Sequence, residues 1–128
     1  MEEAPPSIIE TNFEQSQSSD KIMNTNENIL KIESGEYDFT FHKWSDAQYM
    51  INSKGDRKYT KFIFFKKKFE NKPNVMVSLK GIDSGNKKNT RINLFARDIS
   101  NIGFNLECLT WSDSITYAVY SSWIAIGY

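Results

Sequence analysis

The last segment of the chain constrains the fold most, because it is apolar on both faces of any strand it forms. In residues 115–126, one face of an extended strand carries Ile115, Tyr117, Val119, Trp123 and Ala125, and the other carries Ala118, Tyr120, Ile124 and Ile126. A strand that is apolar on both faces must be covered on both. A small sandwich covers one face with its second sheet. We therefore expect the other face to be covered by another element or by another copy of the chain, and we prefer self-association.

From residue 31 onward, apolar residues alternate with a period of two, which predicts strands with one buried face. The clearest sets are Val75, Val77 and Leu79, then Ile92, Leu94 and Ala96, then Phe104, Leu106 and Cys108. Turn residues separate these sets, and residues 36–41 and 59–65 are further candidate strands. No apolar stripe with helical spacing runs for three turns. The pattern predicts an all-β domain over residues 31–128, with six strands in an antiparallel β-sandwich.

Residues 1–30 have a different composition, rich in Asn, Ser, Gln and Glu, with Pro5-Pro6 near the start. Such a segment buries too little apolar surface to offset its chain entropy, which predicts a disordered or weakly helical tail. Ile8, Ile22 and Ile29 fall on a seven-residue grid. A short coiled-coil stalk therefore stays open as an alternative.

Composition argues against most catalytic and cofactor-dependent classes. Lys+Arg and Asp+Glu balance at 16 each, so no net field favours nucleic acid or an anionic membrane. The single cysteine, Cys108, alternates with apolar residues and is predicted to be a buried, inert thiol. With His42 as the only histidine and no clustered glycines, we expect no zinc site, no phosphate loop and no cofactor. We therefore predict a protein that is not an enzyme.

The expected location follows from two further features of the chain. Residues 1–30 contain no continuous apolar stretch typical of a signal peptide, and no segment is long and apolar enough to span a membrane. We expect a cytoplasmic protein as synthesised, with export to the cell surface or medium by an unconventional route left open.

Three motifs in order carry a resemblance to a known family. They are residues 65–79 (FKKKFENKPNVMVSL), 89–104 (NTRINLFARDISNIGF) and 110–125 (TWSDSITYAVYSSWIA). Together they resemble the H-type lectin domain, the family of snail agglutinins and the C-terminal domain of the discoidins. The resemblance begins near Lys31 and covers about three quarters of the chain. It implies a six-stranded β-sandwich assembled as a homotrimer, which binds galactose or N-acetylgalactosamine between neighbouring protomers and serves in carbohydrate recognition or cell adhesion.

The resemblance also implies which residues contact sugar. Arg91 matches the sugar-contacting arginine, Trp111 the aromatic residue that begins the site loop, and Tyr117 the tyrosine six residues later. Asp56 is the candidate for the family's loop aspartate. Ser112 occupies the position where some members carry a histidine that contacts sugar and a metal on the trimer axis, so we expect no metal there. Carboxylate and guanidinium groups suit sugar hydroxyls, and aromatic rings suit the apolar face of a sugar.

Two other functions remain open at this point. The chain is also consistent with a self-assembling structural or adhesion module that has lost sugar binding. Alternatively, Lys66-Lys67-Lys68, flanked by Phe65 and Phe69, is a candidate surface for a polyanion such as nucleic acid or a sulfated polymer. The balanced net charge favours the simpler interpretation, in which these lysines protect a hairpin end.

Overall fold

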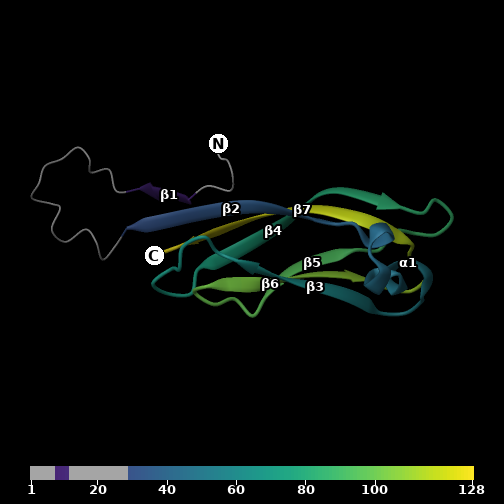
Figure 1. Cartoon of the computed structure of the whole chain (residues 1–128). Helices are drawn as coiled ribbons and strands as arrows, with labels where there is room; N and C mark the ends of the chain where they lie inside the picture. The colour runs from purple at the N-terminus through teal and green to yellow at the C-terminus, as the bar shows by residue number, and fades with distance from the viewer. Residues whose placement is uncertain (1–7, 12–28) are drawn as a thin grey trace, which may run out of the picture.

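Two antiparallel β-sheets packed face to face make up the protein in the computed structural model, which describes residues 8–11 and 29–128 (Figure 1). One sheet has the strand order β1 (Ile8–Thr11), β2 (Leu30–Phe39), β7 (Thr116–Gly127) and β4 (Asn74–Ser84). The other has the order β3 (Arg57–Phe64), β6 (Gly103–Thr110) and β5 (Asn93–Arg97). The six strands β2–β7 confirm the predicted antiparallel β-sandwich.

A short additional strand lies within the N-terminal segment. Strand β1 pairs with the start of β2, from Ile8 opposite Glu33 to Thr11 opposite Leu30. The composition of residues 1–30 did not indicate this strand, because its four residues are too few to change the average of a polar segment. β2 is otherwise an edge strand here, and unpaired edge groups readily accept another strand. Residues 1–7 and 12–28, where most of the predicted tail and the alternative stalk fall, lie outside the described residues.

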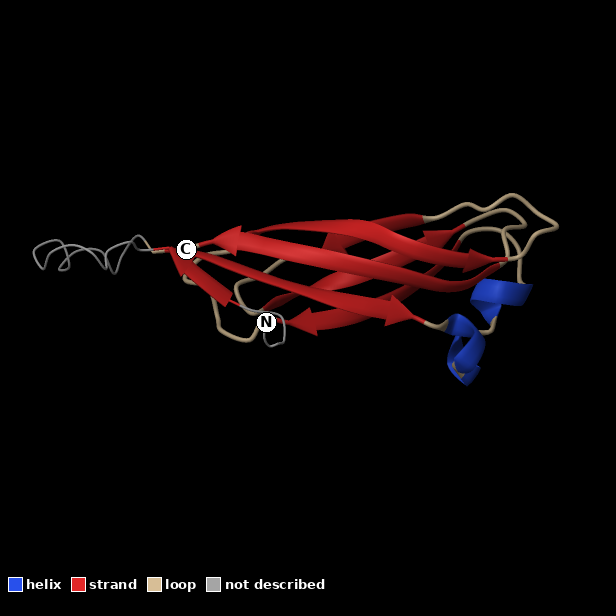
Figure 2. Ribbon diagram, turned by 90° about the horizontal axis from the view of Figure 1, so that it is seen from above, coloured by secondary structure: helices blue, strands red, loops and turns tan. Residues whose placement is uncertain are grey.

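Three short helical turns connect β2 to β3, between the two candidate strands that the sequence predicted at residues 36–41 and 59–65. They are η3 (Phe41–Lys43), η4 (Ser45–Ala47) and α1 (Tyr49–Asn52), and all lie at one end of the elongated sandwich (Figure 2). Each turn contributes one buried side chain, from Phe41, Ala47 and Met50. This segment therefore closes one end of the core.

Strand β7 lies at the centre of its sheet, between β2 and β4. Val119, Ser121, Trp123 and Ala125 are buried on its inner face against the second sheet, whereas Tyr120, Ser122, Ile124 and Ile126 are only half-buried. Before Val119 the expected division of faces was wrong, because Ala118 and Thr116 are buried and Tyr117 is not. The register against β4 shifts between Asp83 and Ser84, so an extra residue of β7 displaces the alternation there.

The outer face of this sheet is hollowed rather than covered. An open groove of about 920 Å³ lies over β2, β4 and β7, lined on its floor by Ser34, Ser78, Ser122, Met76 and Ile124 among others. Met76 is 57% exposed, and Ser78 and Ser122 share a hydrogen bond of 2.8 Å. Within the described part of the chain, no element lies over this groove. The second apolar face is therefore left open by the chain's own described elements.

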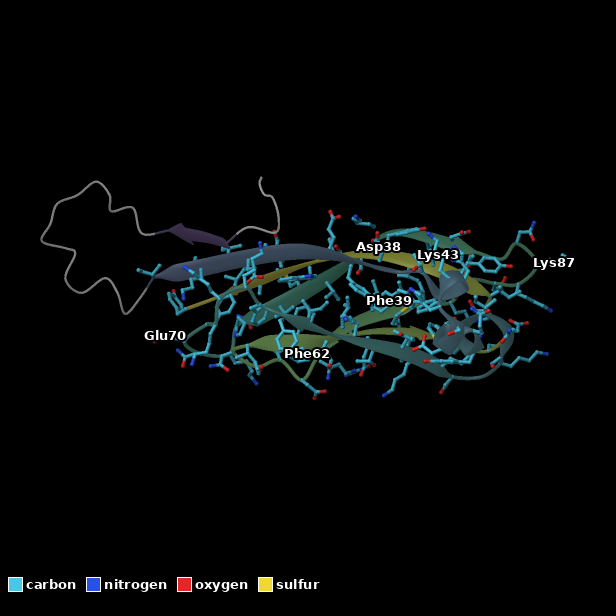
Figure 3. The ribbon with its side chains drawn as sticks, viewed as in Figure 1. Asp38, Phe39, Lys43, Phe62, Glu70 and Lys87 are labelled. Carbon is cyan, nitrogen blue, oxygen red and sulfur yellow. The ribbon has the colours of Figure 1, made fainter. Side chains whose placement is uncertain are left out.

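The two ends of the sandwich differ in what they carry. Strand β2 begins and β7 ends at one end, where the β3–β4 connection with Glu70 also lies (Figures 1 and 3). Lys66, Lys67 and Lys68 are exposed in this connection, and the backbone N–H of Lys66 donates to both carboxylate oxygens of buried Glu33, at 3.0 and 3.1 Å. The helical turns and the β4–β5 and β6–β7 loops occupy the opposite end.

Candidate functional site

Three segments meet at the end of the sandwich that carries the helical turns. They are the connection from β2 to β3, the β4–β5 loop at residues 85–92 and the β6–β7 loop at residues 111–115. Lys43 and Lys87, which belong to two of these segments, are both labelled at this end in Figure 3. All five residues that the resemblance implicates lie in or beside these segments.

Arg57, at the start of β3, ties two of the segments together. Its side chain donates to three backbone carbonyl oxygens: from Nε to Gly55 at 3.0 Å, from one terminal nitrogen to Met50 at 3.1 Å, and from the other to Ser112 at 2.9 Å. Arg57 is only 7% exposed, and burial lowers the pKa of its guanidinium, an effect that the Asp113 charge opposes. Arginine nevertheless stays charged at any ordinary pH. Arg57 therefore acts as an internal brace beneath the loops.

Ser112, a position at which the resemblance implied a sugar contact, contributes its backbone to this brace. Its carbonyl oxygen accepts from Arg57 and from the N–H of Gly55, at 2.9 Å in both cases. Its φ of 59° lies in the left-handed region, which makes the chain turn sharply directly after Trp111. Ser112 thus shapes the loop.

Arg91 lies at the mouth of the β4–β5 loop and is paired with an acid of the β6–β7 loop. One terminal nitrogen of its guanidinium is 2.8 Å from Oδ1 of Asp113, and Lys88 is 3.9 Å from the other carboxylate oxygen. The hydrogen bond from Arg91 is the main reason that the pKa of Asp113 is lowered. The carboxylate therefore stays ionised at neutral pH beside two cations.

Buried hydroxyl groups fix the backbone of these two loops beneath the charged pair. The Thr110 hydroxyl donates to the carbonyl oxygen of Arg91 at 2.7 Å, and the Arg91 N–H donates to Oγ of Ser114 at 3.0 Å. Thr116 lies 3.3 Å from both hydroxyls, and all three hydroxyl residues are buried. This hydrogen-bond network therefore holds the backbone of Arg91 against the start of β7, and the Arg91 side chain takes no part in it.

Asp56 and Trp111 share a pocket of about 350 Å³ on the flank of the same end. Trp111 is 37% exposed, enough for one side of the indole to meet a ligand. Arg57, Lys58, Leu109 and Thr110 complete the lining. The structure therefore brings Asp56 and Trp111 together, and brings Arg91 to the loop that follows Trp111.

Tyr117 does not line this pocket. It is half-buried near the start of β7, and its carbonyl oxygen lies 3.1 Å from Nδ1 of His42. Nothing in the described structure tests the sugar-contact role of Tyr117 or of the other four residues, so those roles stay predictions.

Two residues of the site were not singled out from the sequence. Asp113 stands in the quoted Trp-Ser-Asp-Ser run, but its pairing with Arg91 joins residues 22 positions apart and has no local pattern. Arg57 did have a signal, because it occupies an inward position of a strand whose later inward positions include Tyr59 and Ile63. A cation at a buried strand position needs partners, and here backbone carbonyl oxygens supply them.

Three further observations concern the cysteine, metal binding and membrane spans. Cys108 is buried, as predicted, and burial raises the pKa of its thiol to about 12, which leaves little of the reactive thiolate at neutral pH. In residues 8–11 and 29–128, no three His, Cys, Asp or Glu side chains are grouped closely enough to hold a metal ion. Across those same residues, none of the helices has the length and apolar character needed to cross a membrane.

Comparison with known proteins agrees with this architecture. A curated relative, "ATP synthase subunits region ORF 7" of Fuscovulum blasticum, is 32% identical over 87 residues, which cover 68% of this chain and 76% of the relative. Discoidin II of Dictyostelium discoideum superimposes with a TM-score of 0.65 at 19% identity, over 76% of this chain. That match spans only 36% of the discoidin II chain. An R1-type pyocin tail fibre matches with a TM-score of 0.51 at 15% identity, over 80% of this chain and 75% of that one.

At these identities the two solved structures bear on the fold alone. The family follows instead from the model of the H-type lectin domain, which matches residues 60–126. That range contains Arg91 and the β6–β7 loop, and thus most of the residues on which the resemblance was founded. H-type lectins form a carbohydrate-binding class, and this chain belongs to the H-type lectin domain family.

Proposed function

We propose that this domain binds galactose or N-acetylgalactosamine at sites shared between the protomers of a homotrimer, and that it catalyses no reaction. The observation that carries the proposal is the arrangement around the β6–β7 loop. There the β6–β7 loop presents the exposed ring of Trp111 and the Asp113 carboxylate, which pairs at 2.8 Å with Arg91 of the neighbouring β4–β5 loop.

This arrangement suits the chemistry of a sugar. A guanidinium has five N–H donors in a fixed fork, so Arg91 retains donors for ligand hydroxyls after it pairs with Asp113. The carboxylates of Asp113 and Asp56 can accept hydrogen bonds from sugar hydroxyls. Because epimers of a sugar differ in the direction of one hydroxyl, acceptors at fixed positions favour one epimer. The Trp111 ring offers an apolar surface to the C–H face, with little rotamer entropy to lose.

The proposed trimer would cover the groove on the outer face of the β2–β7–β4 sheet. Half-buried Ile124 and the 57% exposed Met76 line this groove, and no other described element lies over them. A single shallow sugar site has a Kd on the order of millimolar, or about −4 kcal/mol. Three sites on one face would raise the effective affinity for a multivalent glycan by roughly 10²–10⁴. Assembly would therefore be part of the function.

The site is tested by glycan-array binding of the wild type and of Arg91→Ala. We expect the wild type to bind terminal galactose-type sugars and Arg91→Ala to lose at least about tenfold in affinity, because a charge-assisted hydrogen bond contributes about 1.5–3 kcal/mol. Arg97→Ala is the matched control, since Arg97 lies at the end of β5 away from the loops and pairs there with Glu107 of β6 at 2.9 Å. Equal binding by wild type and Arg91→Ala would remove Arg91 from the site.

The assembly is tested by the solution mass. We expect light scattering to give three times the chain mass of 14.9 kDa, and Ile124→Glu to give the monomer because the new charge lies in the groove. Ile102→Glu is the control, since Ile102 is 47% exposed in the connection that precedes β6. A well-folded wild-type monomer at micromolar concentration would contradict the proposed trimer.

The structure also bears on the alternative of a structural module without sugar binding. Arg91 already pairs with Asp113, and the Ser112 carbonyl already accepts from Arg57, so the loops are held in place without a ligand. A trimer that binds no glycan on the array would favour this alternative. Binding that falls steeply with salt would instead point to the exposed lysines at positions 66–68.

A further inference from the structure

A second pocket lies on the flank of the sandwich, between the edges of β2 and β3. It has a volume of about 540 Å³, within the roughly 300–1,000 Å³ of small-molecule sites, and it shares no lining residue with the pocket of Asp56 and Trp111. Its lining comes from β2, η3, η4 and β3, and consists of Tyr37, Lys43, Trp44, Ser45, Asp46, Tyr59, Thr60 and Lys61. No residue proposed for galactose binding belongs to it.

Three aromatic rings form the wall of this pocket. The rings of Trp44 and Tyr59 lie 5.3 Å apart at 36°, and those of Tyr37 and Trp44 lie 6.4 Å apart. All three side chains are half-buried. Their buried parts pack on Phe39 and Phe41 of the core, which holds the wall rigid. A fixed aromatic wall with an open side is the kind of surface on which a sugar ring stacks.

Polar groups surround the wall. The Tyr59 hydroxyl donates to Oδ2 of Asp46 across 3.4 Å, a long bond that leaves carboxylate acceptors free for a ligand. Burial raises the pKa of Tyr59, and the Asp46 charge adds to the effect, so this hydroxyl remains a donor at neutral pH. The hydroxyls of Ser45 and Thr60 are exposed nearby. A ligand with several hydroxyls therefore finds both donors and acceptors.

The charge of the pocket selects among such ligands. Lys43 and Lys61 carry two positive charges against the single negative charge of Asp46. Lys61 Nζ already lies 5.9 Å from the centre of the Tyr37 ring, so the chain itself supplies the cation that an aromatic cage would otherwise bind. Neither lysine forms an ion pair within the described part of the chain. The pocket therefore disfavours a cationic ligand and favours an anionic one.

We infer that this pocket is a second carbohydrate site, which takes an acidic sugar. The apolar face of the ring stacks on Trp44 and Tyr59, the hydroxyls meet Asp46 and the neighbouring hydroxyl side chains, and a carboxylate or sulfate contacts Lys43 and Lys61. This site is independent of the galactose-type site, because the two pockets share no lining residue and one is proposed for a neutral sugar, the other for an anionic one.

The three tryptophans provide the test, since each indole N–H reports on a different place. Trp44 reports on the second pocket, Trp111 on the first, and Trp123 on the buried core. Methyl glucuronide, glucose 6-sulfate and neutral methyl glucoside would be titrated separately into the full-length protein and followed by NMR. Their glucose configuration leaves the proposed galactose-type site unoccupied. The first two ligands distinguish carboxylate from sulfate as the preferred anionic group.

We expect the Trp44 signal to shift and saturate at millimolar concentration of at least one acidic sugar, with binding at least about tenfold weaker for methyl glucoside. Lys43→Glu and Lys61→Glu should each weaken acidic-sugar binding about tenfold, because each reverses one charge-assisted contact. Lys72→Glu, an exposed lysine at the other end of the sandwich, is the matched control. The Trp123 signal should stay unmoved in every variant, which shows that the core is intact.

Three results would overturn the inference. One is a Trp44 signal that does not move at tens of millimolar acidic sugar. The second is an equal shift in the lysine variants and the wild type. The third is a shift with tetramethylammonium but not with the acidic sugars, which would make the pocket a cation site. A separate titration with methyl galactoside tests the first site, and a Trp111 signal that does not shift there would bear on that site only, so the two proposals fail separately.

Discussion

Arg57→Ala is expected to lower the free energy of unfolding by about 3 kcal/mol and to abolish sugar binding. The guanidinium donates to the carbonyl oxygens of Gly55, Met50 and Ser112, and its removal leaves three acceptors without these bonds in a mostly buried place. An unsatisfied buried polar group costs about 1–3 kcal/mol, and water entering the vacated space offsets part of the total. For a domain of this size the midpoint of thermal unfolding should fall by roughly 10–25 °C.

Two further variants make the Arg57 result specific. Lys58→Ala changes the next residue of β3, whose side chain is 64% exposed, and should change the stability by less than about 0.5 kcal/mol; it is a control for stability alone, because Lys58 lines the pocket of Trp111. Arg57→Lys keeps the charge but loses the planar fork, so it should fall between the wild type and the alanine variant. Calorimetry gives the stability and the glycan array gives the binding. An Arg57→Ala protein within 1 kcal/mol of the wild type would show that the loops hold together without this brace.

Trp123→Ala is expected to cost about 3–5 kcal/mol, the range for removing a large buried aromatic side chain. Trp123 is 6% exposed, and its ring lies 5.3 Å from that of Phe104 and 6.0 Å from that of Phe65, so it joins both sheets. Chemical denaturation measures the loss. Trp111→Ala removes the same type of side chain from an exposed position and should cost far less. Comparable losses for the two variants would contradict the assigned roles.

The partner of Trp123 across the sheet is Gly35, and this pairing sharpens the test. A methyl group on Gly35 would lie 2.7 Å from the Trp123 ring, so Gly35→Ala alone should destabilise by about 1–3 kcal/mol through overpacking. In a Trp123→Ala background the same methyl enters the vacated space and should cost much less. A double-mutant cycle measures this coupling. Additive losses would mean that the glycine is not there to make room for the indole.

How far the structure could be predicted from sequence differs between the strands and the loops. Alternation of apolar residues is a local signal, so β4, β5 and β6 lie close to where Val75, Ile92 and Phe104 predicted them. Bulges are not local. The extra residue between Leu79 and Gly81, like the shift near Tyr117, arises from pairing with another strand and leaves no periodic trace in its own.

The residues of the site also differ in how far the sequence could predict their positions. The motif order around Arg91 and Trp111 was enough to predict that their loops belong together, because the family resemblance carried tertiary information. The partners of these residues were not predictable, since Asp113 and Ser114 contact Arg91 only after β6 and β7 have formed. The pocket of Trp44 and Asp46 was missed for the same reason, because these two residues meet Tyr37 of β2 and Tyr59 of β3 only in the folded chain.

The site loops and the C-terminal residue lie at opposite ends of the sandwich, which affects how the protein can be attached to a support. Strand β2 starts and β7 finishes at the end remote from the site loops (Figure 1). The 12 residues of β7, at about 3.3 Å each, span about 40 Å. A sensor chip or fusion partner linked through the C-terminal residue thus stands a full domain length from the loops, and the loops face outward from the support. Immobilisation there leaves both pockets accessible, whereas coupling through the loop lysines at positions 87 and 88 would bring the support to the same end as Arg91.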